Sequence, residues 1–467
     1  MESQKEFRKI VIFICIVAAL GGLLFGLDQG FIANAGKTLN HIYGIADGSI
    51  QEGNFNAILA FGGIAGTLCS GFFTRYLGRK NTLLVAGFSF LIGALVSSLL
   101  PPIEILTACR FTLGFGVGLA SFATPLYLAE TAPTKVRGAM STLFQLMITF
   151  GIFLICLTNV IIVEFVGHTK ISLTLMFSVI TLFAFLMLVG CFFLPKSPRW
   201  LMLKNREEEA RVILAKTRKK DEVELEISEI KQKLGEKKVS IAEAIAKKYF
   251  WKILFVGIVI QMFQQLVGIN MMIYYAPKFL EGAGLNIILA GLMVFFVNFL
   301  STFPAIKWVE KWGRKKLLTV GAIIMMVSLL IAAYSFYLID VSHTTSNAPK
   351  YVLLVFCLVY IFGFACSWGP VAWTLCSEIF PQRVREVGLT VTTIVNWTFV
   401  YVVVSNSNVI MSAGEWGKPL LFIVYAGFCL LSIIFLKFFV PETKGISLEK
   451  IESNLVSGSK LRDLGKE

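Results

Sequence analysis

The sequence has 467 residues, of which 56% are hydrophobic and only 15% are charged, and its mean hydropathy is +0.75. This composition excludes an ordinary soluble domain and indicates a protein that crosses a membrane many times. Apolar runs of about 20 residues or more recur between Ile10 and Val440, and each is long enough to cross a hydrocarbon core of ~30 Å as a helix.

These runs predict twelve transmembrane helices, centred near residues 20, 65, 91, 117, 150, 183, 266, 297, 327, 364, 398 and 429. The first run is too long for the apolar core of a signal peptide, so we expect it to remain in the protein as the first span. The predicted fold class is therefore all-α and integral to the membrane.

The basic residues follow the predicted topology. With a cytoplasmic amino terminus, one of the 43 Lys and Arg, Arg110, falls inside a span and only five fall on the outer side: Lys37, Lys170, Lys278, Lys350 and Lys418. This is the positive-inside distribution, so the net charge of +14 reflects topology and no nucleic-acid partner is expected. Both termini are predicted to be cytoplasmic.

Three short motifs of the first half return in the second half, between 235 and 248 residues later. They are Gly78-Arg79-Lys80 with Gly313-Arg314-Lys315, Glu130 and Arg137 with Glu378 and Arg385, and Pro195 to Arg199 with Pro441 to Gly445. The repetition predicts two parallel six-span halves. We expect an N-terminal bundle over residues 1–194, a cytosolic linker over 195–250, a C-terminal bundle over 251–440 and a cytosolic tail over 441–467.

The linker mixes many charges with apolar residues at helical spacing, which predicts three or four short amphipathic helices. Its apolar positions include Val212, Leu214, Ile227, Ile230 and Leu234. The polar tail from Ser447 onward is expected to be mobile.

The seventh span contains an unusual polar stretch, from Gln264 to Tyr275 (QQLVGINMMIYY). Buried amides without partners cost several kcal/mol, so this stretch predicts a ligand, and amides suit neutral polyhydroxyl molecules. The alternative is that the amides join one helix to another. Asn270 lies about 140° around a straight helix from Gln265, so the chain must bend or unwind near Gly268 if both side chains reach one ligand.

Asp28 in the first span and Arg110 in the fourth are the two buried charges. Charges inside a membrane are costly and usually functional, and each of these residues is the natural partner of the other. The alternative is a static ion pair that only joins two helices.

Seven motifs in this order resemble those of the sugar porters of the major facilitator superfamily, and the chain is most similar to bacterial proton symporters of hexoses and pentoses over nearly its full length. The motifs are Gly21 to Asp28, Gly78-Arg79-Lys80, Glu130 to Gly138, Pro195 to Arg199, Gln264 to Tyr275, Trp368 to Trp373 with Ser377 to Pro381, and Pro441 to Gly445. The resemblance implies two pseudo-symmetric six-helix bundles and monosaccharide transport by proton symport with alternating access. It also implies a monomer in the bacterial inner membrane, with no cofactor and with the proton as coupling ion.

The resemblance also implies roles for individual residues. The expected sugar contacts are Gln145, Gln264, Gln265, Asn270, Asn298, Trp373 and Asn396, flanked by the aromatic residues Phe25, Tyr274, Tyr275 and Trp397. Ordinary core packing is an equal alternative for Phe25 and Trp397. Asp28 and Arg110 are expected to couple proton and sugar movement.

A cytosolic gate is expected from Arg79, Glu130, Arg137, Glu310, Arg314, Glu378 and Arg385. The pairs Glu130–Arg137, Glu378–Arg385 and Glu310–Arg314 are expected to join the halves when the transporter faces outward. The sequence departs from the family pattern at Arg75, Lys196 and Glu386, so the gate is wired differently here.

Two rival functions remain open: a facilitative uniporter, and a sugar sensor built on a transporter fold. An enzyme is not expected, since the sequence has no P-loop, no nucleophile triad and no metal-binding cluster. The three His residues, His41, His168 and His343, all fall in outer loops, and the nine Cys form no paired framework.

Overall fold

The computed structural model describes residues 2–131, 137–217, 223–224, 226–228, 230–231, 243, 245–381, 384–444, 446 and 448–464, and these contain no strand. The first half comprises α1 (Glu2–Tyr43), α2 (Ile50–Tyr76), α3 (Arg79–Ser98), α4 (Ile103–Thr131), α5 (Arg137–Val166) and α6 (Lys170–Phe193). The second half comprises α11 (Lys248–Leu266), α12 (Ile269–Gly282), α13 (Ile287–Trp312), α14 (Arg314–Phe336), α15 (Ala348–Cys366), α16 (Trp368–Ile379), α17 (Arg385–Met411) and α18 (Gly417–Phe439).

The predicted twelve spans are confirmed in the described part of the chain. Eleven helical segments are long and apolar enough to cross a membrane, and the apolar stretch Leu289–Ala305 of α13 is the twelfth. Three of the eleven consist of two consecutive helices: α11 with α12 in Lys248–Gly282, α15 with α16 in Ala348–Ile379, and α14 with the short π-helix η2 (Tyr337–Val341) in Arg314–Val341.

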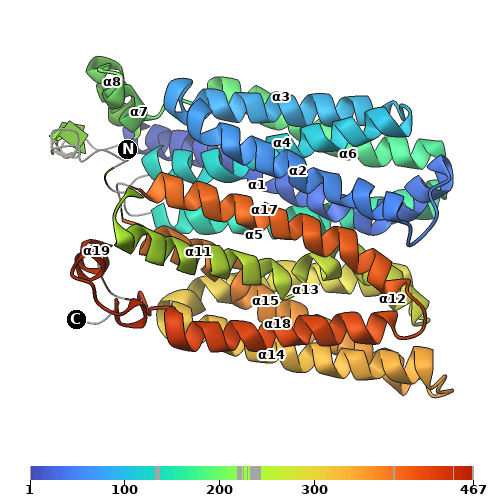
Figure 1. Cartoon of the computed structure of the whole chain (residues 1–467). Helices are drawn as coiled ribbons and strands as arrows, with labels where there is room; N and C mark the ends of the chain where they lie inside the picture. Colours follow the sequence, from blue (N-terminus) through green and yellow to red (C-terminus); the bar gives the residue numbers. More distant parts are fainter. Residues whose placement is uncertain are drawn as a thin grey trace.

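The helices form two bundles that lie side by side (Figure 1). In the first half α1 packs on α5, and α4 packs on α2 and α3; in the second, α14 packs on α15 and α18. Glycines allow the closest approaches: a Cβ on Gly26 of α1 would collide with the Ile148 backbone of α5. The halves meet where α2 packs on α17, α5 on α13 and α1 on α12.

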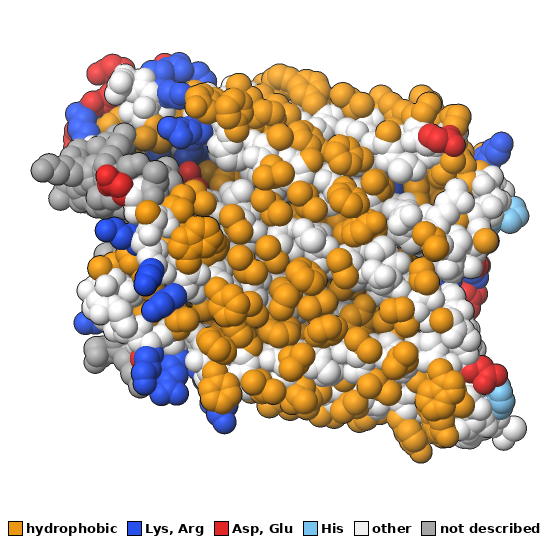
Figure 2. Space-filling view, viewed as in Figure 1, with side chains coloured by type: hydrophobic (Ala, Val, Ile, Leu, Met, Phe, Trp, Pro, Cys, Tyr) orange, Lys and Arg blue, Asp and Glu red, His pale blue; other side chains and the backbone are white. Residues whose placement is uncertain are grey.

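The outer surface separates an apolar belt from two polar ends. Figure 2 shows hydrophobic side chains over the side of the bundle, with Lys and Arg concentrated at the end that carries both chain termini. We call this end the linker face, because α7 (Pro198–Leu203) and α8 (Glu207–Thr217) lie there, and the opposite end the distal face. An apolar belt bounded by charged ends is the surface expected of a membrane-spanning bundle.

The linker and the tail differ in part from the expectation. Two linker helices, α7 and α8, are described, and Leu214, Ile227 and Ile230 join a small buried cluster, whereas Val212 is exposed. Leu234 lies outside the described residues. The tail is not an extended mobile segment, because it forms α19 (Leu448–Val456), which packs on α16 and buries Ile451 and Leu455.

Candidate functional site

The seventh span is broken at Gly268, as the sequence predicts. Helix α11 ends at Leu266 and α12 starts at Ile269, and between them Gly268 adopts φ +98° and ψ 15°, a left-handed conformation that favours glycine. The Tyr360 hydroxyl donates to the carbonyl of Val267 at 2.9 Å, which satisfies a backbone group that the break removes from the helix. The break therefore allows α11 and α12 to aim their side chains at a common point.

Five buried amides form one hydrogen-bonded cluster around this break. The Asn396 amide nitrogen donates to the side-chain oxygens of Gln261 at 2.8 Å and Gln264 at 2.6 Å. The Gln265 amide nitrogen donates to Gln264 Oε1 at 2.7 Å and Asn396 Oδ1 at 3.1 Å, and Asn270 donates to Gln265 Oε1. Each amide combines a donor and an acceptor, so the cluster can exchange these bonds for bonds to hydroxyl groups. Gln261 belongs to this cluster although it is not among the predicted sugar contacts.

The other predicted contacts lie on neighbouring helices. Gln145 on α5 and Trp373 on α16 are half-buried, and Asn298 on α13 is buried. These helices pack against one another or against the broken span: α5 on α13, α13 on α12, and α16 on α11. The hydrogen bonds described above do not include the three side chains, so their place in the site rests on helix packing.

The predicted aromatic residues line the contact between the halves. The rings of Phe25 and Trp397 lie 5.4 Å apart between centroids, and a Cβ on Gly63 of α2 would lie 2.6 Å from the Trp397 ring. The buried indole N–H of Trp397 has no hydrogen-bond partner among the described residues. The Tyr275 hydroxyl donates to the carbonyl of Val404 at 2.9 Å. Trp397 thus offers a free donor close to Phe25 of the other half.

Gln29 also lies in this region and is not among the predicted sugar contacts. Its amide nitrogen on α1 donates to Asn270 Oδ1 at 2.6 Å, so the first half contacts the amide cluster directly. The signal was available, because Gln29 is a polar residue inside the first span, next to Asp28.

Asp28 of α1 and Arg110 of α4 lie close together inside the protein. Both are almost fully buried, and Arg110 Nη1 lies 3.7 Å from Asp28 Oδ1. Among the described residues, neither carboxylate oxygen and none of the three guanidinium nitrogens has a hydrogen-bond partner. The guanidinium carbon also lies 5.4 Å from the centre of the Phe55 ring. The pair is therefore held by charge rather than by directed hydrogen bonds.

At the linker face, Arg79 and Glu130 form a buried ion pair, with 2.7 Å between Nη2 and Oε1. The Ser197 hydroxyl donates to the second carboxylate oxygen. Arg79 Nη1 also donates to the carbonyl of Thr74 at 3.1 Å. The helix that begins with Arg79 follows Gly78, whose φ is +88°.

The second half repeats this arrangement. Arg314 Nη2 lies 2.7 Å from Glu378 Oε1, and the Thr443 hydroxyl donates to Glu378 Oε2 at 2.6 Å. Arg314 Nη1 donates to the carbonyl of Val309 at 3.3 Å, and Gly313 again has φ +88°. The predicted internal repeat therefore extends to individual hydrogen bonds.

The expected gate pairs between the halves stay a prediction. The side chains of Arg137 and Glu310 lie outside the described residues, and Arg385 Nε donates to the carbonyl of Phe380 at 3.4 Å. Glu130 and Glu378 instead contact arginines of their own halves.

Charged side chains also join the halves at the distal face, among them two of the lysines predicted on the outer side, Lys37 and Lys278. Lys37 Nζ of α1 lies 2.6 Å from Glu281 Oε1 of α12. Lys278 Nζ of α12 lies 3.2 Å from both carboxylate oxygens of Glu52, a buried residue of α2. Asn408 of α17 donates to Glu52 Oε2 at 2.7 Å. Glu52 therefore connects α2 to two helices of the other half.

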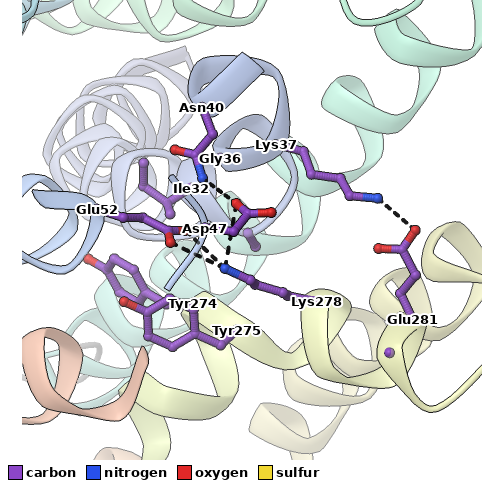
Figure 3. A pocket seen from close by; sticks show the side chains of 12 residues that line it. Ile32, Gly36, Lys37, Asn40, Asp47, Glu52, Tyr274, Tyr275, Lys278 and Glu281 are labelled. Carbon is purple, nitrogen blue, oxygen red and sulfur yellow. Dashed lines mark hydrogen bonds and ion pairs between the residues drawn. The ribbon is translucent and has the colours of Figure 1, made fainter. Parts of the chain in front are cut away.

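Lys37, Glu52, Lys278 and Glu281 line a cavity of about 220 Å³ at the distal face (Figure 3). Gly36 and Asp47 of the first half line one side, and Tyr274 and Tyr275 of α12 line the other. The two tyrosines come from the same polar stretch as Asn270, so the cavity is lined by the helix that also carries this member of the amide cluster.

Comparison with known proteins identifies the family. The family model described as "Sugar (and other) transporter" matches residues 14–455. The chain is 37% identical to the galactose-proton symporter of Escherichia coli (strain K12) over 99% of each chain. It is 33% identical to the arabinose-proton symporter of the same strain, over 99% of this chain and 97% of that protein.

A solved structure agrees with the fold. The proton:xylose symporter XylE of the major facilitator superfamily, bound to 6-bromo-6-deoxy-D-glucose, superimposes with a TM-score of 0.79 at 29% identity, covering 96% of this chain and 99% of that one. The family is one of transporters and not of enzymes, so the chain is a multi-pass membrane protein with the twelve-helix fold of this superfamily. The chain belongs to the sugar (and other) transporter family.

Proposed function

We propose that this protein carries a monosaccharide across the bacterial inner membrane together with a proton, by alternating access. The observation that carries the proposal is the pairing of two sites: a cluster of buried amides around Gly268, and the buried Asp28–Arg110 pair. Amides recognise hydroxyl groups from several directions, whereas an intramembrane carboxyl beside an arginine can take up and release a proton. The full-length similarity to proton symporters of galactose and arabinose supports this assignment.

The proposed sugar contacts are Gln145, Gln264, Gln265, Asn270, Asn298, Trp373 and Asn396. The Trp373 indole would cover an apolar face of the sugar while the amides bind its hydroxyls. Asp28 takes up the proton. When its carboxyl is neutral, its attraction to Arg110 weakens, and the sugar-loaded protein changes from the outward-facing to the inward-facing conformation. When the proton leaves, the ion pair forms again.

The linker face is proposed to be cytoplasmic, with both termini on that side. The concentration of Lys and Arg at this end supports the orientation. The distal cavity then lies on the outer side of the membrane. The protein is proposed to work as a monomer in the lipid bilayer, without a cofactor.

The experiment is sugar uptake into proteoliposomes of the purified protein, with D-galactose, D-glucose, D-xylose and L-arabinose tested in turn. An imposed inward proton gradient should drive at least one of them to a higher concentration inside than outside. Equal concentrations on both sides, with rapid exchange, would instead identify a uniporter. Binding without any flux would identify a sensor.

A further inference from the structure

Gln29 contacts the amide cluster from the opposite half of the molecule. It lies on α1, half-buried, and its Nε2 donates to Asn270 Oδ1 at 2.6 Å across a separation of 241 residues. Asn270 is 1% exposed, and its own amide nitrogen donates to Gln265. Both ends of the Asn270 amide are therefore engaged, one by its own half and the other by α1.

The position of Gln29 on α1 is held firmly by the rest of the first half. A Cβ on Gly26 would collide with the backbone of Ile148, and one on Gly30 would lie 3.0 Å from the Ile152 backbone. Helix α1 therefore packs directly on the α5 backbone at this level and moves together with α5. Asn270, in contrast, lies in the first turn of α12, immediately after the break at Gly268. The Gln29–Asn270 bond thus joins a fixed element to one with a hinge at its start.

Gln29 is also adjacent in sequence to Asp28. Residues next to each other on one helix shift together when the helix moves. The bond to Asn270 therefore lies on the same turn of α1 that carries the proposed proton-binding carboxyl.

We propose that Gln29 is a specificity-determining residue of the sugar site, which binds one hydroxyl of the sugar together with Asn270. This inference rests on the proposed function. In the empty site the two amides bind each other; in the loaded site a sugar hydroxyl lies between them, donating to one amide and accepting from the other. No bond is left unmade in either state, so the exchange is close to neutral for the correct sugar. A sugar without that hydroxyl leaves the half-buried Gln29 amide nitrogen and the buried Asn270 Oδ1 apart and without a partner, and is rejected.

The test uses the full-length protein in proteoliposomes and measures sugar exchange, which needs no proton gradient. The sugar exchanged fastest by the wild type is identified first. Each singly deoxygenated form of that sugar then competes with it, for the wild type and for Gln29→Leu. Gln29→Asn, which keeps the amide on a shorter side chain, is the second variant. Asn406→Leu is the matched control, because among the described residues its exposed amide donates to groups of its own helix, the carbonyl of Val402 and Ser405 Oγ.

In the wild type, removal of one particular hydroxyl should weaken binding by about tenfold. In Gln29→Leu this penalty should shrink to about twofold or less at that one position, while the penalties at the other positions persist. Gln29→Asn should show the same change, and Asn406→Leu should keep the wild-type profile.

A role in structure alone would lower binding of every analogue by the same factor. That result, or an unchanged profile in both Gln29 variants, overturns the inference and leaves sugar transport intact. If the wild type exchanges none of the sugars, the proposed function itself fails.

Discussion

The ammonium of Lys37 lies 2.6 Å from the carboxylate of Glu281, so the first helix of one half is tied to the far end of the broken span of the other. Lys278 and Glu52 form a second ion pair between the halves, in which the first half supplies the anion and the second half the cation. Asp47 Oδ1 also lies 3.8 Å from Lys278 Nζ, so the first half supplies one cation and two anions to this junction and the second half one of each. Any conformation with an open distal face must separate both pairs.

Glu52→Gln is expected to favour opening of the distal face. Glu52 is 5% exposed and contacts both Lys278 and Asn408. Loss of its negative charge should destabilise the conformation with a closed distal face by about 1 kcal/mol, which shifts the equilibrium toward the open conformation about fivefold. A cysteine at Gly36 reports opening, because Gly36 lines the cavity and an added Cβ meets no atom closer than 3.6 Å. Its labelling by a membrane-impermeant maleimide should become several times faster.

The matched control for that experiment is Glu415→Gln. Glu415 lies 3.6 Å from His343 at the same end of the molecule, but both residues belong to the second half and both are exposed. Labelling of the Gly36 cysteine should not change in this control. An unchanged rate in Glu52→Gln as well would show that the ion pairs do not hold the face closed.

Lys196→Glu is expected to stabilise the protein. In the second half Glu442 accepts from the backbone N–H groups of Arg314 at 2.8 Å and Lys315 at 3.1 Å, and so caps the start of α14. Lys196 occupies the equivalent place of the repeated motif near the start of α3, where a cation opposes the helix dipole. The substitution should raise the free energy of unfolding by about 0.5–1 kcal/mol and the Tm by about 1–2 °C.

Two variants accompany Lys196→Glu in the thermal unfolding measurement. Glu442→Gln should lower the Tm, because it removes the charge that caps α14. Lys460→Glu makes the same charge change at an exposed residue of the tail and should leave the Tm unchanged. An equal rise in Lys460→Glu would attribute the effect to net charge and not to the cap.

Asp28→Asn should abolish concentrative uptake and spare sugar exchange. The amide cannot take up the proton, so the membrane potential can no longer do work on the sugar. A potential of ~100 mV is worth ~2.3 kcal/mol per proton, enough for roughly fifty-fold accumulation at one proton per sugar. The measurement compares gradient-driven uptake with exchange in the same proteoliposomes. Undiminished accumulation would refute the role of the pair.

Gly268→Ala should damage both stability and transport. A residue with a side chain is strained at φ +98°, and the added Cβ would lie 2.9 Å from the Tyr425 ring. We therefore expect the free energy of unfolding to fall by about 2 kcal/mol. Gly427→Ala on α18 is the control, because an added Cβ there meets no atom within 4 Å. Thermal unfolding and exchange rates of the two variants provide the comparison.

The sequence predicted the elements well where the signal is local. Twelve apolar runs gave twelve spans, because every backbone group in a bilayer must be satisfied within its own helix. The break at Gly268 followed from the angle between Gln265 and Asn270. The second break, at Ser367 with φ −131° and ψ −86°, was not predicted, because neither Gly nor Pro occupies that position.

Which side chains pair with each other could be determined only from the fold. The sequence shows that Glu130 and Arg79 both recur, but not that they pair with each other, since 51 residues separate them and Arg137 is closer along the chain. The contact between Gln29 and Asn270 is hidden in the same way by a separation of 241 residues. The tail helix had a readable signal in Ile451 and Leu455, four residues apart on one face, which its polar composition concealed.

The break at the left-handed residue Gly268 also allows α12 to tilt as a unit about its first turn. The helix runs from Ile269 to Gly282, which at 1.5 Å per residue gives an arm of about 20 Å. A tilt of about 10° at its start would displace its far end by about 3.5 Å, more than the 2.6 Å between Lys37 and Glu281. Asn270 lies next to the start of α12, whereas Lys278 and Glu281, which form the two ion pairs, lie near its end. A movement of well under 1 Å at the amide cluster is thus magnified several times at the entrance, purely by geometry.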